Sequence, residues 1–237
     1  MHRELAVITG ITGALGSAIA MTLAEAGYFV VGAARDAKRG RSLVRKIGVK
    51  RSRFYRVDVG SESSIRRMFS KRLFKESHLS AVITCAGILE RGSVSEFRPA
   101  SWKRSVRVNL SGVFFTLQQS LKLLEKQRGG LIIVIGSRWG SSGAAGAAVY
   151  ATTKSALRAM VRSIQLEYAN TPIRALLVSP GSVESRMSRS VDPSARGKLL
   201  DPRDVAELVL FLIRTPAHVI FDEIGIKAYA YDMAGGS

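Results

Sequence analysis

The 237-residue sequence holds a single cysteine, Cys85, so it cannot form an intramolecular disulfide, and a reducing, cytoplasmic location is expected. Its three histidines are isolated from one another, so no metal site is expected. No apolar run reaches roughly 18 residues, which argues against a membrane span. The first predicted strand begins within a few residues of the N-terminus, so no signal peptide is expected. Only six prolines and 46% hydrophobic residues indicate one globular domain over residues 1–237.

Acidic residues are scarce: 18 Asp and Glu face 36 Lys and Arg, a formal net charge of +18. Between Arg35 and Arg56, ten of 22 positions are basic, and further cations follow at 66–75. Such blocks usually form solvated helix faces. They would also suit a polyanion, which leaves nucleic acid, acidic lipid or an acidic carrier protein open as a partner. Few aromatic residues interleave with the run, which disfavours nucleic acid.

Short β-type runs alternate with helical patterns along the whole chain, which predicts an α/β fold. We expect a single-domain, Rossmann-like, doubly wound parallel sheet with helices on both faces, whose ligands bind at the carboxyl ends of the strands. The predicted strands are 3–9, 28–34, 54–58, 80–84, 130–136, 173–178 and 224–231. The predicted helices are 15–26, 38–47, 62–75, 101–126, 149–169 and 202–214.

Tyr150 and Lys154 are four residues apart on a predicted helix, and therefore project from the same face. A tyrosine with its ordinary pKa of about 10 is a poor acid or base at neutral pH, and a nearby ammonium lowers that pKa. Lowering it by about three units takes roughly 4 kcal/mol. We therefore expect a desolvated site, or help from a positively charged cofactor. Alone, this spacing more often marks a solvated helix surface.

Glycines connect the first strand to the first helix, in the order Gly10, Gly13 and Gly16. Gly10 permits a tight turn, and Gly16 lets the helix approach the strand closely. The helix N-terminus then offers free N–H groups to a pyrophosphate. The simpler interpretation is a tight connection in a parallel sheet.

Taken together, these motifs resemble the short-chain dehydrogenase/reductase family in its single-domain form, over residues 5–190. The resemblance implies a catalytic set of Asn109, Ser137, Tyr150 and Lys154. It also implies that Tyr150 and Lys154 contact a nicotinamide cofactor together with Gly10, Thr12, Gly13, Ala14, Leu15, Gly16, Arg35, Asp36, Asp58, Val59, Ala86, Gly87, Pro180, Gly181, Val183 and Ser185. Taken singly, Ser137 would be interpreted as a strand cap and Asn109 as a polar group packed inside a helix.

Three departures from the family pattern stand out. Ala14 replaces the middle glycine of the cofactor loop, and is tolerable there if its φ is negative. Thr84-Cys85 replaces two asparagines whose amides normally brace the strand ends. Ser185 replaces a threonine and keeps the hydroxyl.

Cofactor choice depends on the end of the second strand. Arg35 stands there, where a carboxylate would favour NAD(H), so we expect NADP(H). Asp36 leaves NAD(H) as the less favoured alternative, because a carboxylate one residue later can still meet the ribose.

The expected activity is NADPH-dependent reduction of a ketone, aldehyde or 3-oxoacyl group to an alcohol. Tyr150 would move the proton, Ser137 would hold the carbonyl, and Lys154 would lower the tyrosine pKa and hold the ribose. By resemblance, Asn109 would anchor a water leading to Lys154, and the chain would form a homodimer or homotetramer through helices 101–126 and 149–169. The alternatives are an alcohol or sugar dehydrogenase working oxidatively and a non-catalytic nucleotide-sensing or nucleic-acid-binding module.

Overall fold

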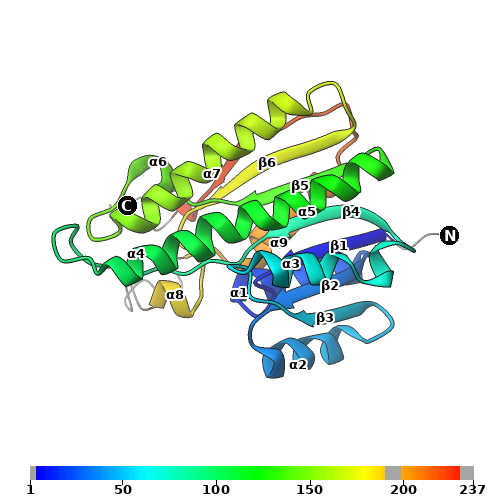
Figure 1. Ribbon diagram of the computed structural model, residues 1–237, viewed down its shortest axis with the longest axis horizontal. Coiled ribbons are helices and arrows are strands. Elements are labelled where there is room, and N and C mark those ends of the chain that lie inside the picture. Colours follow the sequence, from blue (N-terminus) through cyan, green and yellow to red (C-terminus); the bar gives the residue numbers. More distant parts are fainter. Residues whose placement is uncertain (1–3, 190–198, 230–237) are drawn as a thin grey trace.

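The computed structural model describes residues 4–189 and 199–229, which build a seven-stranded sheet covered by helices on both faces (Figure 1). All pairings are parallel, in the order β3-β2-β1-β4-β5-β6-β7, so the chain winds outward from β1 in both directions. The expected doubly wound fold is confirmed. The strands are β1 (Glu4–Thr9), β2 (Phe29–Ala34), β3 (Ser52–Arg56), β4 (His78–Thr84), β5 (Gly130–Ile135), β6 (Ile173–Pro180) and β7 (Glu223–Ile226).

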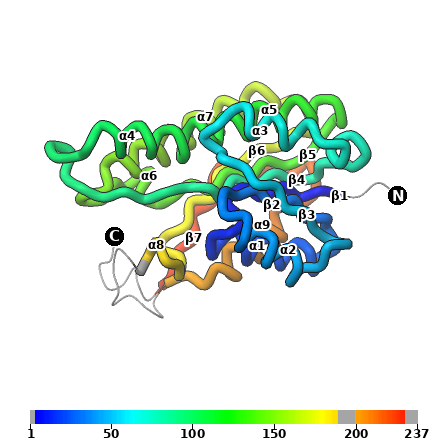
Figure 2. Tube along the Cα trace, turned by 60° about the horizontal axis from the view of Figure 1, so that its bottom comes forward, coloured from blue at the N-terminus to red at the C-terminus, as the bar shows by residue number. Residues whose placement is uncertain are grey.

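Two hydrophobic clusters hold the helices to the sheet, one on each face. Alternate strand residues enter opposite clusters: Val7 and Val31 lie on one side, Ile8 and Val30 on the other. Because both faces are covered, the inner strands are apolar almost throughout. Helices α1 (Ala14–Glu25), α2 (Ala37–Ile47) and α9 (Pro202–Arg214) cover one face, and α3 (Glu62–Phe69), α5 (Gly112–Gln127) and α7 (Ala148–Glu167) cover the other (Figure 2).

The helix expected at 62–75 ends early. Helix α3 stops at Phe69, and a separate 3₁₀ turn, η1, covers Arg72–Phe74. The break turns Phe74 back into the core, where its ring centroid lies 4.9 Å from that of Phe69. Burial of a second aromatic ring outweighs continuation of a short, strongly basic helix.

The helix expected at 101–126 is interrupted by a wide turn. It consists of α4 (Pro99–Val106), the π-helix η2 (Arg107–Ser111) and α5. The N–H of Gly112 donates to the carbonyl of Arg107, five residues earlier. Gly112 sits so close to Val59 that a Cβ there would come within 2.9 Å of its Cγ2. This glycine therefore sets how near η2 and α5 approach the carboxyl edge of the sheet.

Smaller differences concern strand ends and short helices. β3 was expected at 54–58 but ends at Arg56, and β7 was expected at 224–231 but ends at Ile226, with residues 230 and 231 outside the described part. Two short helices, α6 (Trp139–Ser142) and α8 (Arg186–Arg189), were not predicted. Within 4–189 and 199–229, no helix is both long and apolar enough to cross a bilayer.

Candidate active site

The turn between β1 and α1 forms a cradle of backbone N–H groups. Gly10 has a φ of 71°, and a Cβ on it would lie 2.6 Å from the backbone nitrogen of Ala86. A Cβ on Gly16 would come within 2.5 Å of the Gly10 carbonyl oxygen. Both positions therefore require glycine for close approach. Gly13 is the N-cap of α1 and supplies no side-chain acceptor, so the first N–H groups of the helix remain available to an anion.

Ala14 is the first residue of α1 and does not have a positive φ, which is the condition under which alanine can replace the family's glycine there.

The replacement of two asparagines by Thr84-Cys85 leaves one buried polar atom without a hydrogen bond. Thr84 is 2% exposed, and its Oγ1 has no hydrogen-bond partner in the described structure. Instead, the sheet end is braced by Thr9, whose Oγ1 accepts from the Ala86 N–H at 3.4 Å. Burial raises the pKa of the Cys85 thiol to about 12, which makes it a poor nucleophile.

Two charged residues follow β2, and they differ in their partners. Asp36 caps α2, because its Oδ1 accepts from the Arg39 N–H at 3.0 Å. Arg35 and Arg39 line the same cavity as Asp36, and both side chains are exposed. The carboxylate of Asp36, at the end of β2, is therefore hydrogen-bonded to the backbone of the protein's own helix α2.

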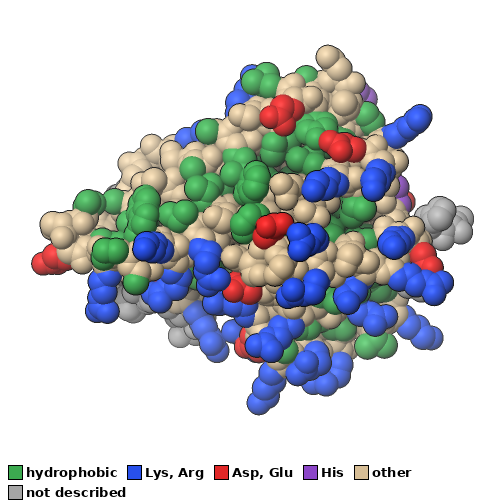
Figure 3. All heavy atoms as spheres, in the orientation of Figure 1, with side chains coloured by type: hydrophobic (Ala, Val, Ile, Leu, Met, Phe, Trp, Pro, Cys, Tyr) green, Lys and Arg blue, Asp and Glu red, His purple; other side chains and the backbone are tan. Residues whose placement is uncertain are grey.

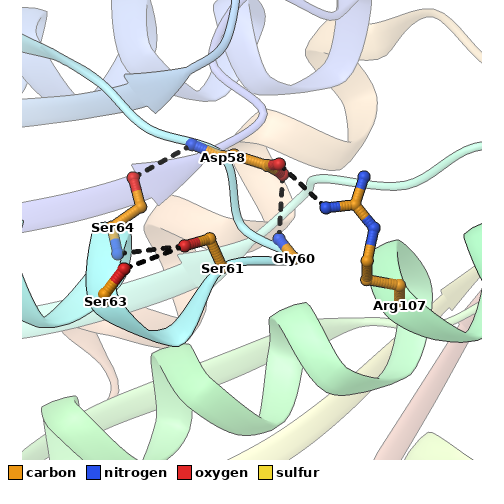
Figure 4. Close-up of polar contacts among 6 residues, drawn as sticks. All are labelled: Asp58, Gly60, Ser61, Ser63, Ser64 and Arg107. Atoms are coloured by element: carbon orange, nitrogen blue, oxygen red, sulfur yellow. Dashed lines mark hydrogen bonds and ion pairs between the residues drawn. The ribbon is translucent and has the colours of Figure 1, made fainter.

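Asp58, which was expected near the adenine, lines the same cavity as Arg35 and Asp36 and is held by three hydrogen bonds (Figure 4). Its carboxylate accepts from the Gly60 N–H at 3.0 Å and from Arg107 Nη1 at 2.9 Å. Its own N–H donates to Ser64 Oγ at 3.2 Å. Arg107 belongs to the π-helix, so this ion pair ties the Asp58 end of the cavity to the helix that carries Asn109.

The polar centre of the cavity comes from the end of β5 and the start of α7. The hydroxyls of Ser137 and Tyr150 are hydrogen-bonded to each other, although the residues are thirteen apart in sequence. Trp139 meets the Tyr150 ring edge-on, at 6.1 Å between centroids and 89° between planes. The Trp139 N–H also donates to Ser137 Oγ at 3.3 Å. Tyr150 is therefore fixed by packing and by the serine that would share its substrate.

Lys154 lies one helical turn beyond Tyr150 and is 6% exposed. Its Nζ donates to the Ile135 carbonyl at 2.7 Å and lies 5.7 Å from the Tyr150 ring centroid. Burial lowers the pKa of Lys154 to about 8. Burial also raises the pKa of Tyr150, and the bond to Ser137 offsets this in part. Desolvation therefore dominates the pKa of Tyr150 in this structure, and the lowering of that pKa by Lys154 together with a charged cofactor stays a prediction.

Asn109 is fully buried behind the cavity wall rather than in its lining. Its Oδ1 accepts from the Ile88 N–H at 2.8 Å, and its Nδ2 donates to the Ile88 carbonyl at 2.9 Å and to Thr153 Oγ1 at 3.3 Å. It therefore clamps the segment after β4 to the helix that carries Tyr150 and Lys154. The packing role weighed for Asn109 from sequence is observed, and the water-anchoring role stays a prediction.

The segment after β6 closes the cavity. Gly181 N–H donates to the Ile226 carbonyl at 2.8 Å, and Val183 forms a bridge with Leu200. Ser185, expected to contact the carboxamide, accepts from the Ser188 N–H at 3.0 Å through its Oγ. The serine hydroxyl is thus already used to cap α8.

These elements surround one cavity of about 650 Å³. All the expected site residues except Asn109 line it, namely Gly10, Thr12, Gly13, Ala14, Leu15, Gly16, Arg35, Asp36, Asp58, Val59, Ala86, Gly87, Ser137, Tyr150, Lys154, Pro180, Gly181, Val183 and Ser185. Two further lining cations, Arg138 and Lys227, were missed from sequence. Arg138 could have been found from its position directly after Ser137, whereas Lys227 fell inside the strand expected at 224–231. No cluster of three potential metal ligands occurs in the parts of the chain described.

A glycine cradle and a Ser–Tyr–Lys centre at the carboxyl edge of a doubly wound sheet define a dinucleotide-dependent class of enzyme. The model of the family described as short chain dehydrogenase matches residues 4–196. The chain belongs to this family and is an oxidoreductase.

Known proteins similar to the chain agree with this assignment over nearly its full length. An uncharacterized oxidoreductase of Staphylococcus aureus is 28% identical, over 94% of this chain and 96% of its own. A solved alcohol dehydrogenase from the archaeon Thermococcus sibiricus, complexed with 5-hydroxy-NADP, is 27% identical with a TM-score of 0.88, covering 96% of this chain and 97% of that one. Actinorhodin polyketide ketoreductase with NADPH is 26% identical with the same TM-score and coverage.

Proposed function

We propose that the protein is an NADPH-dependent reductase that converts a carbonyl group to an alcohol. The observation that carries this proposal is the Ser137–Tyr150 hydrogen bond beside buried Lys154, in the cavity that the glycine cradle opens. A bound nicotinamide would supply the hydride. The residues of the chain would hold the carbonyl, move the proton and exclude water.

In this mechanism, the hydroxyls of Ser137 and Tyr150 both donate to the substrate oxygen, and Tyr150 gives up its proton as the alkoxide develops. The raised pKa of Tyr150 keeps the phenol protonated at neutral pH, the form that a reductase needs as an acid. Lys154, held on the Ile135 carbonyl, would meet the nicotinamide ribose and stabilise the phenolate left behind. Asn109 would keep the Tyr150 helix in register with Ile88.

The preference for NADP(H) is supported by the charges after β2. Arg35 and Arg39 face the cavity, and a guanidinium pairs well with a 2′-phosphate. Asp36 already accepts the Arg39 N–H, which leaves it less able to bind a ribose 2′-hydroxyl. Two similar solved enzymes carry NADP-type ligands, 5-hydroxy-NADP and NADPH.

Parallel titrations with NADPH and NADH at one fixed salt concentration test the cofactor preference. We expect tighter binding of NADPH, and an Arg35→Ala variant that loses this preference while still binding NADH. Equal affinities in the wild-type protein would contradict the role of Arg35.

Turnover tests the proposed chemistry. Tyr150→Phe should bind NADPH like the wild type but reduce carbonyls about 10²–10⁴-fold more slowly, the usual contribution of a general acid. An active Tyr150→Phe enzyme would refute the assignment. Oxidation of alcohols without reduction of carbonyls would favour the oxidative alternative.

A homodimer or homotetramer is part of the same proposal. Trp102 on α4, Phe114 on α5 and Leu166 on α7 are 44%, 45% and 63% exposed, and the space-filling view shows apolar side chains gathered over these helices (Figure 3). Lys and Arg concentrate elsewhere on this face, around α2 and α3 (Figure 3). A second copy of the chain would cover the apolar part. Light scattering would reveal a mass of two or four chains.

A further inference from the structure

The edge of the sheet formed by β3 and its covering helix α2 carries many cations and no acidic residue. Residues 37–56, which we call the basic edge, contain nine Lys and Arg, six of them Arg, and neither Asp nor Glu. All nine side chains are exposed, and Lys and Arg gather on this side of the molecule in the space-filling view (Figure 3). None of the nine forms an ion pair with a described residue. The charge of this surface is therefore not neutralised within the described chain.

Helix α2 holds part of this charge in a fixed row. Its buried residues are Gly40, Val44 and Ile47. A Cβ on Gly40 would come within 2.1 Å of Phe54 Cε2, so the helix rests directly on β3. Arg41 and Arg45 are four residues apart and project away from that contact, along a helix about 16 Å long.

Strand β3 carries the charge around the edge of the sheet. Among the described strands, it pairs with β2 alone. Arg53 and Arg56 are paired there with Val31 and Ala34, which belong to opposite hydrophobic clusters. The two arginines therefore lie on opposite faces of the sheet edge, and the basic edge is a convex ridge rather than a flat surface.

Acids on adjoining segments leave this excess in place. Asp36 caps α2, and Asp58 is paired with Arg107. Residues 62–76 hold two glutamates, each paired with an arginine of that segment, and five exposed cations. Glu25, at the end of α1, contributes one exposed negative charge, and Arg35, which precedes the basic edge, adds one positive charge. Positive charge therefore predominates on both faces of this edge.

The basic edge lacks the features by which proteins, single strands and membranes are usually bound. Val49 is its only exposed large apolar side chain, whereas protein interfaces have an apolar centre. The rings of Phe54 and Tyr55 are partly buried and pack against the two hydrophobic clusters, so they offer no stacking surface to a single-stranded base. A convex ridge presents only part of its charge to a flat bilayer. These observations favour a rod-shaped polyanion.

We propose that the basic edge binds the phosphate backbone of duplex nucleic acid without reading its sequence. Contacts to phosphates supply the affinity of non-specific binding and need neither apolar nor stacked side chains. Six arginines suit this role, because a guanidinium can bind two phosphate oxygens at once. Apart from Arg39, no cation of the basic edge lines the proposed cofactor cavity, so this site does not depend on the reductase function.

Fluorescence polarisation with a short labelled DNA duplex, over a series of KCl concentrations, tests the proposal. For the wild type, the logarithm of the association constant should fall linearly with the logarithm of the salt concentration, with a slope of about −4 to −6 for roughly five to seven phosphate contacts. The triple variant Arg41→Gln/Arg45→Gln/Lys46→Gln should make this slope shallower by about 2–3 and weaken binding about 10–100-fold at low salt.

A matched control is needed because any protein of this net charge attracts polyanions. The triple variant Lys122→Gln/Lys126→Gln/Arg203→Gln removes the same charge from exposed positions on α5 and α9. It should leave the slope and the affinity close to those of the wild type, because charges more than a Debye length of about 10 Å from the duplex are largely screened. Thermal unfolding checks that both variants are folded. Equal weakening of binding in the two variants would overturn the proposal.

Other probes separate this site from its rivals. Duplex RNA in place of DNA identifies which duplex is preferred, and binding of either that depends on the α2 cations supports the proposal. Tighter binding of a single strand, or binding to phosphatidylserine vesicles or polyglutamate but to neither duplex, would contradict it. Tyr150→Phe should bind the duplex like the wild type, so failure of the reductase proposal and failure of this one give different results.

Discussion

Replacing Lys154 with methionine should make the protein more stable, even though it removes a central group of the proposed site. Burial lowers the pKa of Lys154 from 10.5 to about 8, so keeping its charge in the folded protein at neutral pH costs about 3 kcal/mol. Methionine fills a similar volume without charge. It leaves the Ile135 carbonyl without its 2.7 Å donor, which costs about 1–2 kcal/mol. The net expected gain is about 1–2 kcal/mol, or about 2–8 °C in Tm.

The pH dependence of the free energy of unfolding tests the same prediction in a second, independent measurement. Because the native pKa is lowered, the unfolded chain binds the proton more tightly between about pH 8 and 10.5, and wild-type stability gains from this group as pH rises through that range. Below about pH 8 the full cost is present. The advantage of Lys154→Met should therefore shrink by about 2 kcal/mol between pH 7 and pH 9.5, as urea unfolding would measure.

Lys126→Met, an exposed change on α5, is the control and should alter stability little at either pH. A Lys154→Met protein less stable than the wild type at pH 7, or an advantage that does not change with pH, would refute the reasoning. Loss of carbonyl reduction in the same variant is expected from the proposed mechanism.

Two further predictions concern stability away from the reacting atoms. Thr84→Val should stabilise the protein by about 1 kcal/mol in thermal unfolding, because the buried Thr84 hydroxyl has no partner in the described structure; Thr116→Val, which removes a hydroxyl bonded to a backbone carbonyl, should not stabilise it. Hydrogen bonds from Arg158, and then from Ser179, lower the pKa of Glu223 below its ordinary 4.5. Its stabilisation should therefore be present above about pH 4.5 and decline below it, so the stability difference between wild type and Glu223→Gln in urea should be smaller at pH 3 than at pH 7. A difference independent of pH would contradict this.

Much of the fold follows from local sequence. Glycines between an apolar strand and an amphipathic helix predicted the cradle. The structure agrees, because Gly10 and Gly16 occupy positions where a Cβ would collide with backbone atoms. Parallel strands place their carboxyl ends at one edge, so residues following those strands could be assigned to one site before any contact was known. The order of the expected strands was correct throughout the chain.

Other features depend on contacts that no local pattern encodes. The π-helix at 107–111 accompanies the close approach of Gly112 to Val59, a contact distant in sequence, so a single long helix was expected. Asp36 could have faced the ribose, and its role as a helix cap depends on backbone angles at that residue. Arg138 was missed because charged residues near strand ends are usually solvated, and Lys227 was missed because it fell inside the strand expected at 224–231. The Tyr150 pKa depends on how deeply the hydroxyl is buried, which sequence does not reveal.

The strand order also has a consequence for how such a protein can diversify. The cradle, Arg35 and Asp58 come from the stretch that ends with β4 and Gly87, whereas Ser137, Tyr150, Arg138 and Lys227 all come from later strands and helices. Under the proposed function, the groups that would hold the phosphates and the adenine end of the nucleotide are encoded before the groups that would hold the substrate. Changes in the later part could therefore alter which carbonyl is reduced while the cradle, Arg35 and Asp58 stay unchanged, provided that Tyr150, Lys154 and residues 180–185, which would also meet the nicotinamide end, are kept.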